Sequence, residues 1–263
     1  MGRTSGGWKR SLTINISQRP LDPRDDRDHV TQFGATRVAG VTTILLVRHG
    51  HVPGIEPERF RGRADIELTD RGVIEARKTA EWIARFWQPT IVYTSPMKRC
   101  RDTAAEIAAR CCQAGAEVLA GLNDLHYGEW QWQIAEAVAA ESPVLYQRWR
   151  ATPELMRFPM GESLQELAAR AADALRLAIE KHPTETLVMV SHDSVNRVLL
   201  LQALGEPLSA YWKLAQEPCA INVIAITPDR VTVRMNETTH LHGLVDRLIA
   251  HPPPASGGLC GRD

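Results

Sequence analysis

The stretch Ile44-Leu45-Leu46-Val47-Arg48-His49-Gly50 constrains the fold of this chain more than any other. Its four consecutive apolar residues are typical of a strand buried on both faces, as in a parallel sheet. The run stops at a cation, an imidazole and a glycine. Because open α/β sheets place their ligand sites at the carboxyl ends of such strands, we expect His49 to carry out chemistry there.

A second histidine occupies the same kind of position. Residues 186–190 form another apolar run, which ends in Ser191-His192-Asp193. If both strands are central, the two imidazoles meet at one edge of the sheet. Either histidine alone could be a structural residue at a strand end, but the matched pair favours a function.

Strand and helix patterns alternate along the chain. Thr69 is a suitable N-cap for a helix that ends before Pro89, and Ser95-Pro96 offers a cap and first turn for a helix reaching Cys111. Arg99 falls in that first turn, where an arginine beside free backbone N–H groups can bind an anion. The remaining expected elements are strands at 90–94 and 116–120, helices at 133–141, 143–150, 163–181 and 194–204, and a hairpin at 221–226 and 230–235.

This alternation predicts one α/β domain with a largely parallel sheet, spanning 41–237. Residues 1–40 are rich in Arg, Asp, Gly and Ser without a sustained period, and we expect them to form a disordered arm. N-terminal sequencing of the native protein would decide whether it carries this arm. Residues 238–263 contain Pro252-Pro253-Pro254 and a Gly-rich end, which predicts a tail.

The charge balance limits the classes of partner. Lys+Arg 31 equals Asp+Glu 31, so no overall field favours nucleic acid or an anionic membrane, and we expect neither as a partner. No apolar run approaches membrane-spanning length. The five cysteines form no C-x-x-C pair, which favours reduced thiols and a cytoplasmic setting. The sequence shows no convincing cluster of metal ligands, so neither a metal nor a cofactor is expected.

Six blocks follow one another along the chain: LVRHGH (46–51), RGRADIELTDRG (61–72), SPMKRCRDTA (95–104), LNDLHYGEW (122–130), GESL (161–164) and SHDSVNR (191–197). In this order they resemble the histidine phosphatase superfamily, in its phosphoglycerate mutase-like branch, over essentially all of 43–226. The resemblance implies a three-layer sandwich, with a mostly parallel central sheet flanked by helices. It also implies a phosphatase acting on a small phosphorylated metabolite.

The resemblance assigns roles to individual residues. His49 resembles the nucleophile that becomes phosphohistidine. Arg61 and Gly62 match the loop that reaches over the substrate. The phosphate pocket is matched by Arg48, Arg99 and His192.

Three positions depart from the family pattern, namely Asp124, Asp193 and His51. Asp124 stands where the family has a glutamate that protonates the leaving group. Asp193, directly after His192, is a rival proton donor, because the acid phosphatase branch takes its donor from a His-Asp pair. We favour Asp124, because its surrounding block matches better, and expect Asp193 to bind substrate. His51, where Ser, Thr, Glu or Gln is commoner, is also a candidate substrate contact.

These residue types suit phosphomonoester chemistry. A neutral imidazole avoids the repulsion that an anionic nucleophile would meet, and guanidinium groups offset the charge on the phosphate oxygens. A poor alkoxide leaving group needs a proton from an acid with a raised pKa, which burial in the aromatic segment 127–132 would provide.

Two alternatives stay open at this point. A cofactor-dependent phosphoglycerate mutase has a longer insertion than the 32 residues between Gly128 and Gly161, and a short cap favours hydrolysis. A non-catalytic phosphate-binding module is compatible with Asp124 and His51, but not readily with the full set of histidines and arginines. The hairpin at 221–235 could pair with a second copy, so a homodimer is possible.

Overall fold

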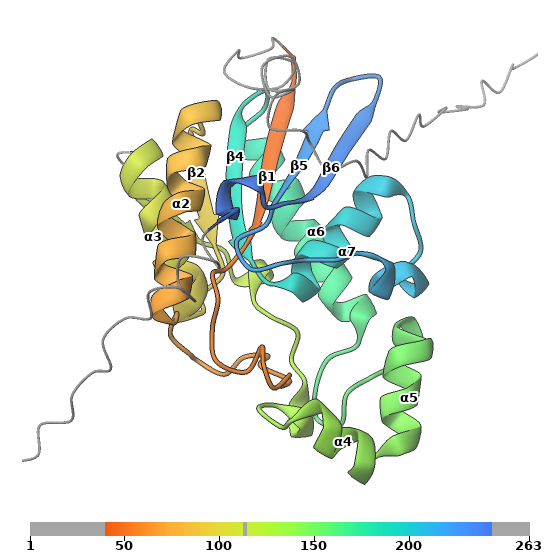
Figure 1. Cartoon of the computed structure of the whole chain (residues 1–263). Coiled ribbons are helices and arrows are strands. Elements are labelled where there is room, and N and C mark those ends of the chain that lie inside the picture. Colours follow the sequence, from red (N-terminus) through yellow and green to blue (C-terminus); the bar gives the residue numbers. More distant parts are fainter. Residues whose placement is uncertain (1–39, 113–114, 244–263) are drawn as a thin grey trace, which may run out of the picture.

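The computed structural model describes residues 40–112 and 115–243 (Figure 1). Nearly all of the expected N-terminal arm and most of the expected C-terminal tail lie outside these residues. Within them, no helix has the length and apolar character needed to cross a membrane.

The central sheet has six strands in the order β3-β2-β4-β1-β5-β6. Strand β1 pairs in parallel with β4, which continues in parallel through β2 to β3. On the other side, β5 runs antiparallel to β1 and forms the expected hairpin with β6. The strands are β1 (Thr42–Arg48), β2 (Ile91–Thr94), β3 (Ala116–Val118), β4 (Thr186–Ser191), β5 (Ile221–Ile226) and β6 (Val231–Glu237).

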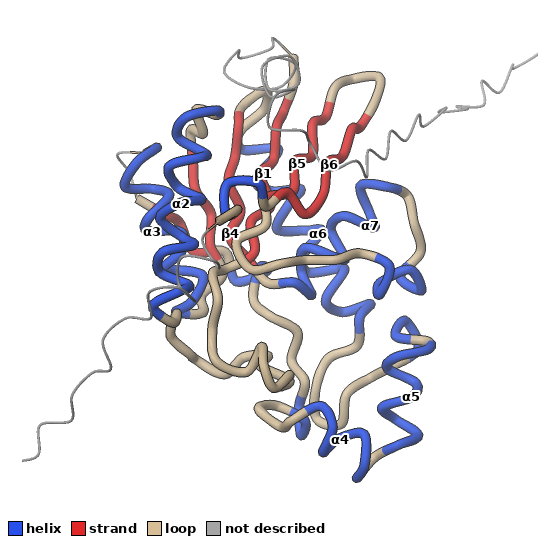
Figure 2. Tube along the Cα trace, viewed as in Figure 1, coloured by secondary structure: helices blue, strands red, loops and turns tan. Residues whose placement is uncertain are grey.

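Helices cover both faces of the sheet, which confirms the three-layer arrangement expected from the sequence (Figures 1 and 2). The pair α2 (Asp70–Phe86) and α3 (Lys98–Cys111) packs on one face, and α6 (Leu164–Lys181) and α7 (Asp193–Leu204) pack on the other. Two shorter helices, α4 (Ala135–Glu141) and α5 (Pro143–Ala151), lie away from the sheet. The 3-10 helices are η1 (Ala120–Leu122), η2 (Gly128–Trp130), η3 (Pro153–Leu155), η4 (Leu208–Lys213) and η5 (Thr239–Leu241).

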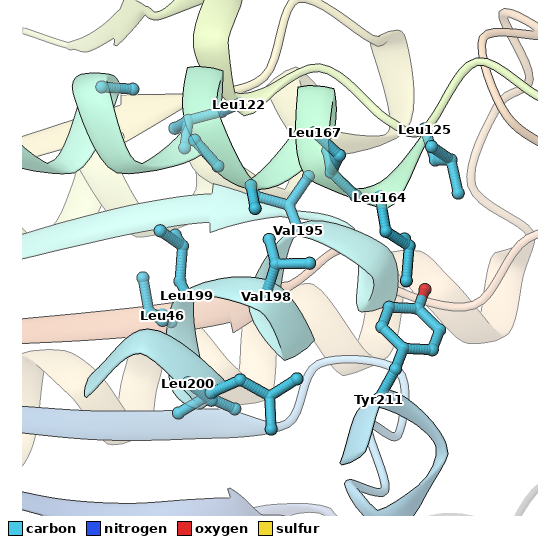
Figure 3. Close-up of a cluster of buried hydrophobic side chains, with 14 of the residues drawn as sticks. Leu46, Leu122, Leu125, Leu164, Leu167, Val195, Val198, Leu199, Leu200 and Tyr211 are labelled. Carbon is cyan, nitrogen blue, oxygen red and sulfur yellow. The ribbon is translucent and has the colours of Figure 1, made fainter. Parts of the chain in front are cut away.

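The apolar run of β1 explains why this strand is central. Ile44 and Leu46 enter the core under α6 and α7, whereas Leu45 and Val47 enter the core under α2 and α3. All four side chains are fully buried, and burying each one stabilises the fold by roughly 1.5–3 kcal/mol. Figure 3 shows Leu46 beside the side chains of α7. A strand with apolar residues on both faces fits only between two helical layers.

Three helices near the site, α2, α3 and α6, have a capping residue that the sequence predicts. Two of them begin where that residue indicates. Thr69 caps α2, because its Oγ1 accepts a hydrogen bond from the Gly72 N–H at 3.1 Å. Ser163 caps α6 through a complete capping box. The expected cap at Ser95 is wrong: α3 begins at Lys98, whose N–H donates to Asp65 Oδ1 at 2.9 Å. The Ser95 hydroxyl is instead paired with the imidazole of His192.

Candidate active site

The two histidines that follow apolar strands meet at one edge of the sheet. His49 follows β1 and His192 follows β4, and these strands are neighbours. Their ring centroids are 5.3 Å apart, and both side chains are buried. The structure therefore confirms that the two strands are central and brings the imidazoles together.

The surroundings of His49 leave one ring nitrogen free for nucleophilic attack. Its Nδ1 lies 2.8 Å from the carbonyl oxygen of Gly50. A carbonyl only accepts hydrogen bonds, so Nδ1 carries the proton and the lone pair remains on Nε2. Burial, followed by the charges of Arg99, His192 and Arg48, holds the pKa of His49 well below its usual value. The ring is therefore neutral at physiological pH.

Two buried arginines flank this imidazole. Arg99 is fully buried and donates to the carbonyl oxygens of Gly62 at 2.6 Å and Ala64 at 2.8 Å. Arg48 donates through Nη1 to the carbonyl of Gln216 at 2.5 Å. In both arginines the buried Nε has no hydrogen-bond partner within the described residues. A buried donor without a partner is costly, and a phosphate oxygen would satisfy it.

His192 is held as a neutral ring beside these cations. Its Nε2 lies 2.8 Å from Ser95 Oγ, and its Nδ1 lies 3.4 Å from Asp124 Oδ2. Burial and the charge of Arg99 lower the pKa of His192 well below its usual value. It can therefore donate one hydrogen bond without adding charge to the site.

The surroundings of Asp124 shift its pKa upward. The carboxyl group is buried and accepts hydrogen bonds from Arg99 Nη2 at 3.0 Å and from Ser194 Oγ at 2.5 Å. Burial raises the pKa of Asp124 above its usual value, and the opposing charge of Arg99 does not cancel the effect. A carboxyl group with a raised pKa is suited to general acid catalysis.

Asp193 lies in the opposite environment. Its Oδ2 accepts a hydrogen bond from Arg197 Nη1 at 3.2 Å, and Arg61 approaches its Oδ1 to 3.9 Å. Burial alone would raise the pKa of Asp193, but Arg48, Arg197 and Arg61 together lower it far below the usual range. The side chain is therefore an anion under all ordinary conditions.

The backbone that carries Asp124 is held by an arginine of α6. Arg170 donates to the carbonyl oxygens of Gly121, Asn123 and Asp124 at 2.7–2.9 Å. Glu162 bonds Arg170 at 3.0 Å and also accepts from the backbone N–H of His126. The carboxylate of Glu162 is thus a brace for the acid-bearing loop, whereas Ser163 provides the cap of α6.

A pocket opens beside these residues. It is lined by Arg61, Gly62, Asp124 and Asp193, all of which the sequence suggested. His51 does not line it, because its Nδ1 is paired with Thr69 Oγ1 at 2.9 Å at the start of α2. Tyr127 also lines the pocket, together with six residues that sequence reasoning missed: Glu58, Arg59, Phe60, Trp149, Arg197 and Trp212. The more deeply buried His49, Arg48, Arg99 and His192 are not among the lining residues.

A signal for Arg197 was present in the sequence. It lies four residues after Asp193 on α7, and residues at this spacing share one face of a helix. Trp149 of α5 and Trp212 of η4 carry no comparable signal, because their positions depend on how the cap packs. Among the residues that the structure describes, no three His, Cys, Asp or Glu side chains gather as a metal site would require.

Comparison with known proteins gives consistent matches. The family model of the histidine phosphatase superfamily (branch 1) matches residues 44–238. Phosphoserine phosphatase 1 of Hydrogenobacter thermophilus is 30% identical over 201 residues, which cover 75% of this chain and 93% of that protein. The metal-independent phosphoserine phosphatase of Arabidopsis thaliana is 34% identical over 164 residues, covering 62% of this chain and 68% of that protein.

Solved structures share the fold. A mycobacterial glucosyl-3-phosphoglycerate phosphatase has a TM-score of 0.68 at 21% identity, covering 75% of this chain and 100% of that chain. A phosphoserine phosphatase from Entamoeba histolytica, in complex with 3-phosphoglyceric acid, has a TM-score of 0.68 at 23% identity, covering 76% of this chain and 99% of that chain.

Proposed function

The chain belongs to the histidine phosphatase superfamily and is a phosphoric monoester hydrolase, and we propose that it acts on small phosphorylated metabolites through a phosphohistidine formed on His49. One observation carries this proposal: a neutral imidazole lies beside two buried arginines, and among the described residues its Nε2 and the Nε of each arginine have no hydrogen-bond partner. This arrangement supplies a nucleophile and the charge that a phosphoryl group needs.

In the first step, Nε2 of His49 attacks phosphorus while the bond to the alcohol oxygen breaks. Arg48 and Arg99 stabilise the charge on the phosphoryl oxygens. The neutral His192 ring would exchange one of its partners, Ser95 or Asp124, for a phosphoryl oxygen and donate its one N–H to it. Asp124 gives its proton to the departing alkoxide, which leaves as the alcohol.

In the second step, a water molecule attacks the phosphohistidine. Asp124, now a carboxylate, accepts a proton from this water. The N–P bond breaks, His49 returns to its neutral form, and inorganic phosphate is released. The carbonyl of Gly50 keeps its hydrogen bond to Nδ1 and so stabilises the positive charge that the ring carries in the intermediate.

The proposal assigns the proton donor to Asp124 and not to Asp193. A higher pKa makes a carboxyl group a better proton donor, and burial raises the pKa of Asp124. Arg48, Arg197 and Arg61 lower the pKa of Asp193 far below the usual range. The two aspartates therefore have separate roles, as in other enzymes whose environments separate the pKa values of paired carboxyl groups.

Hydrolysis of p-nitrophenyl phosphate in the presence of EDTA tests the function. The wild-type protein is expected to release phosphate, and the H49A variant is expected to lose at least 10³-fold in kcat. His182→Ala is the matched control, because this histidine is paired with the Tyr93 hydroxyl and lies outside the site. Equal activity of wild type and H49A would refute the nucleophile. Quenching with labelled substrate should trap an acid-labile phosphoprotein that H49A does not form.

The mutase alternative is tested with 3-phosphoglycerate and its bisphosphorylated primer. Free phosphate is expected to form faster than 2-phosphoglycerate, since the cap between Gly128 and Gly161 is short. The reverse order of rates would favour the mutase.

We also propose a cytoplasmic setting and a homodimer. The cysteines of the described residues are all free, as expected in a reducing compartment. Strand β6 lies at an edge of the sheet, where a second copy could add its own edge strand. A sizing measurement in solution would test the dimer.

A further inference from the structure

The pocket contains a pair of opposite charges that do not complete their own contact. Arg61 Nη2 and Asp193 Oδ1 are 3.9 Å apart, which is too long for a hydrogen bond. The two side chains are 11% and 18% exposed, and both residues line the pocket beside Asp124. Because Asp124 is the proposed proton donor to the leaving alcohol, both residues lie on the leaving-group side of the proposed site.

The other polar atoms of both groups are anchored. Arg61 Nη1 donates to the carbonyl of Gly54 at 2.7 Å, and Asp193 Oδ2 accepts from Arg197 Nη1 at 3.2 Å. Within residues 40–112 and 115–243, neither Arg61 Nη2 nor Asp193 Oδ1 has a hydrogen-bond partner of its own. A cationic donor and an anionic acceptor, each without a hydrogen bond of its own, thus lie side by side in the wall of the pocket.

The charges of the pair determine which groups can bind beside it in the pocket. The guanidinium favours a carboxylate, and the carboxylate of Asp193 favours an ammonium group. A group with both charges is bound by both residues and leaves the local charge unchanged. A group with only a carboxylate would bind Arg61 but would leave Oδ1 of Asp193 without a donor.

Resting on the phosphohistidine chemistry proposed above, we propose that Arg61 and Asp193 form a leaving-group subsite for phosphomonoesters whose alcohol carries an amino group beside a carboxylate. Arg61 binds the carboxylate, and Asp193 binds the ammonium group. The substrate class is therefore a phosphorylated hydroxy-amino acid.

A matched set of substrates tests this subsite. O-phosphoserine and 3-phosphoglycerate differ only in an ammonium group or a hydroxyl at the carbon next to the carboxylate, and phosphoethanolamine lacks the carboxylate. The wild-type kcat/KM for O-phosphoserine is expected to exceed that for either other compound by about 10-fold to 100-fold, the effect of one charge-assisted hydrogen bond. Similar values for O-phosphoserine and 3-phosphoglycerate would overturn the proposal without any variant.

Substitutions then separate the two residues. D193N is expected to bring the ratio between O-phosphoserine and 3-phosphoglycerate close to one. Arg61→Gln is expected to bring the ratio between O-phosphoserine and phosphoethanolamine close to one. Glu58→Gln removes one negative charge at an exposed position of the same pocket and should leave the first ratio unchanged. Equal shifts in D193N and E58Q would mean that only the overall charge matters and would refute the subsite.

Hydrolysis of p-nitrophenyl phosphate distinguishes failure of the subsite from failure of the function. This compound has neither an ammonium group nor a carboxylate. Activity toward it that depends on His49, together with no preference for O-phosphoserine, would reject the subsite and keep the phosphatase. The absence of His49-dependent activity toward both p-nitrophenyl phosphate and O-phosphoserine would reject the phosphatase itself.

Discussion

At the scale of single residues, Asp124 and Asp193 show how surroundings shift the pKa values of two identical side chains in opposite directions. Both line one pocket, yet burial raises the pKa of Asp124, and three arginines lower that of Asp193. Their contacts differ in the same way: Asp124 accepts from a buried hydroxyl and one arginine, whereas Asp193 faces several cations. Residue type alone would not have separated them.

Asp124→Asn is expected to impair hydrolysis according to the leaving group. With an alkyl phosphate, kcat should fall about 10²-fold to 10⁴-fold, because the amide cannot give a proton to the alkoxide. With p-nitrophenyl phosphate the loss should be much smaller, since p-nitrophenolate leaves without protonation. Steady-state rates on both substrates provide the measurement. If Asp193→Asn, and not Asp124→Asn, shows this dependence on the leaving group, the assignment of the acid is wrong.

At the scale of elements, the loop after β1 packs against the first turn of α2 without room for a side chain. A Cβ on Gly72 would overlap the carbonyl oxygen of His51, and a Cβ on Gly50 would lie 2.5 Å from the carbonyl oxygen of Gly72. Gly50 holds Nδ1 of His49, so this close approach positions the proposed nucleophile.

Gly72→Ala therefore separates packing from helix propensity. Propensity alone would stabilise α2 by about 1 kcal/mol, whereas the overlap should give a net destabilisation of about 1–3 kcal/mol. Urea unfolding measures whether Gly72→Ala raises or lowers the free energy of unfolding. Ala84→Gly, at an exposed position of the same helix, gives the propensity effect alone. A more stable Gly72→Ala protein would show that the loop moves away freely.

The sequence predicts the elements best where one local pattern decides the structure. Strands β1 and β4 are uninterrupted apolar runs, and their central positions brought His49 and His192 together as expected. The start of α3 was mispredicted, because the Ser95 hydroxyl is bound to a residue nearly a hundred positions away. Trp149 and Trp212 reach the pocket through packing of the cap, and no local pattern contains that information.

At the scale of the whole molecule, the site is built inside the fold and not on its surface. His49, His192 and Arg99 are among the most buried polar groups, and their surroundings stabilise neutral imidazoles. His240, outside the site, is partly buried beside Thr79, and burial lowers its pKa to about 4. Burial also lowers the pKa of His51, so the folded protein resists protonation at these four histidines.

This resistance predicts how stability depends on pH. An unfolded histidine has a pKa of about 6.5, so below that pH the unfolded chain binds protons that the folded protein does not. The contribution of these histidines to the free energy of unfolding should thus be fully present above about pH 6.5. It should fall as the pH decreases, by at most about 1.4 kcal/mol per pH unit for each histidine. Asp124, with its raised pKa, opposes this trend at lower pH. Urea unfolding between about pH 5 and 7.5 measures how steeply the free energy of unfolding changes with pH. His240→Gln should reduce that slope by the contribution of one histidine. A free energy of unfolding that stays constant over this range would show that the folded protein accepts these protons.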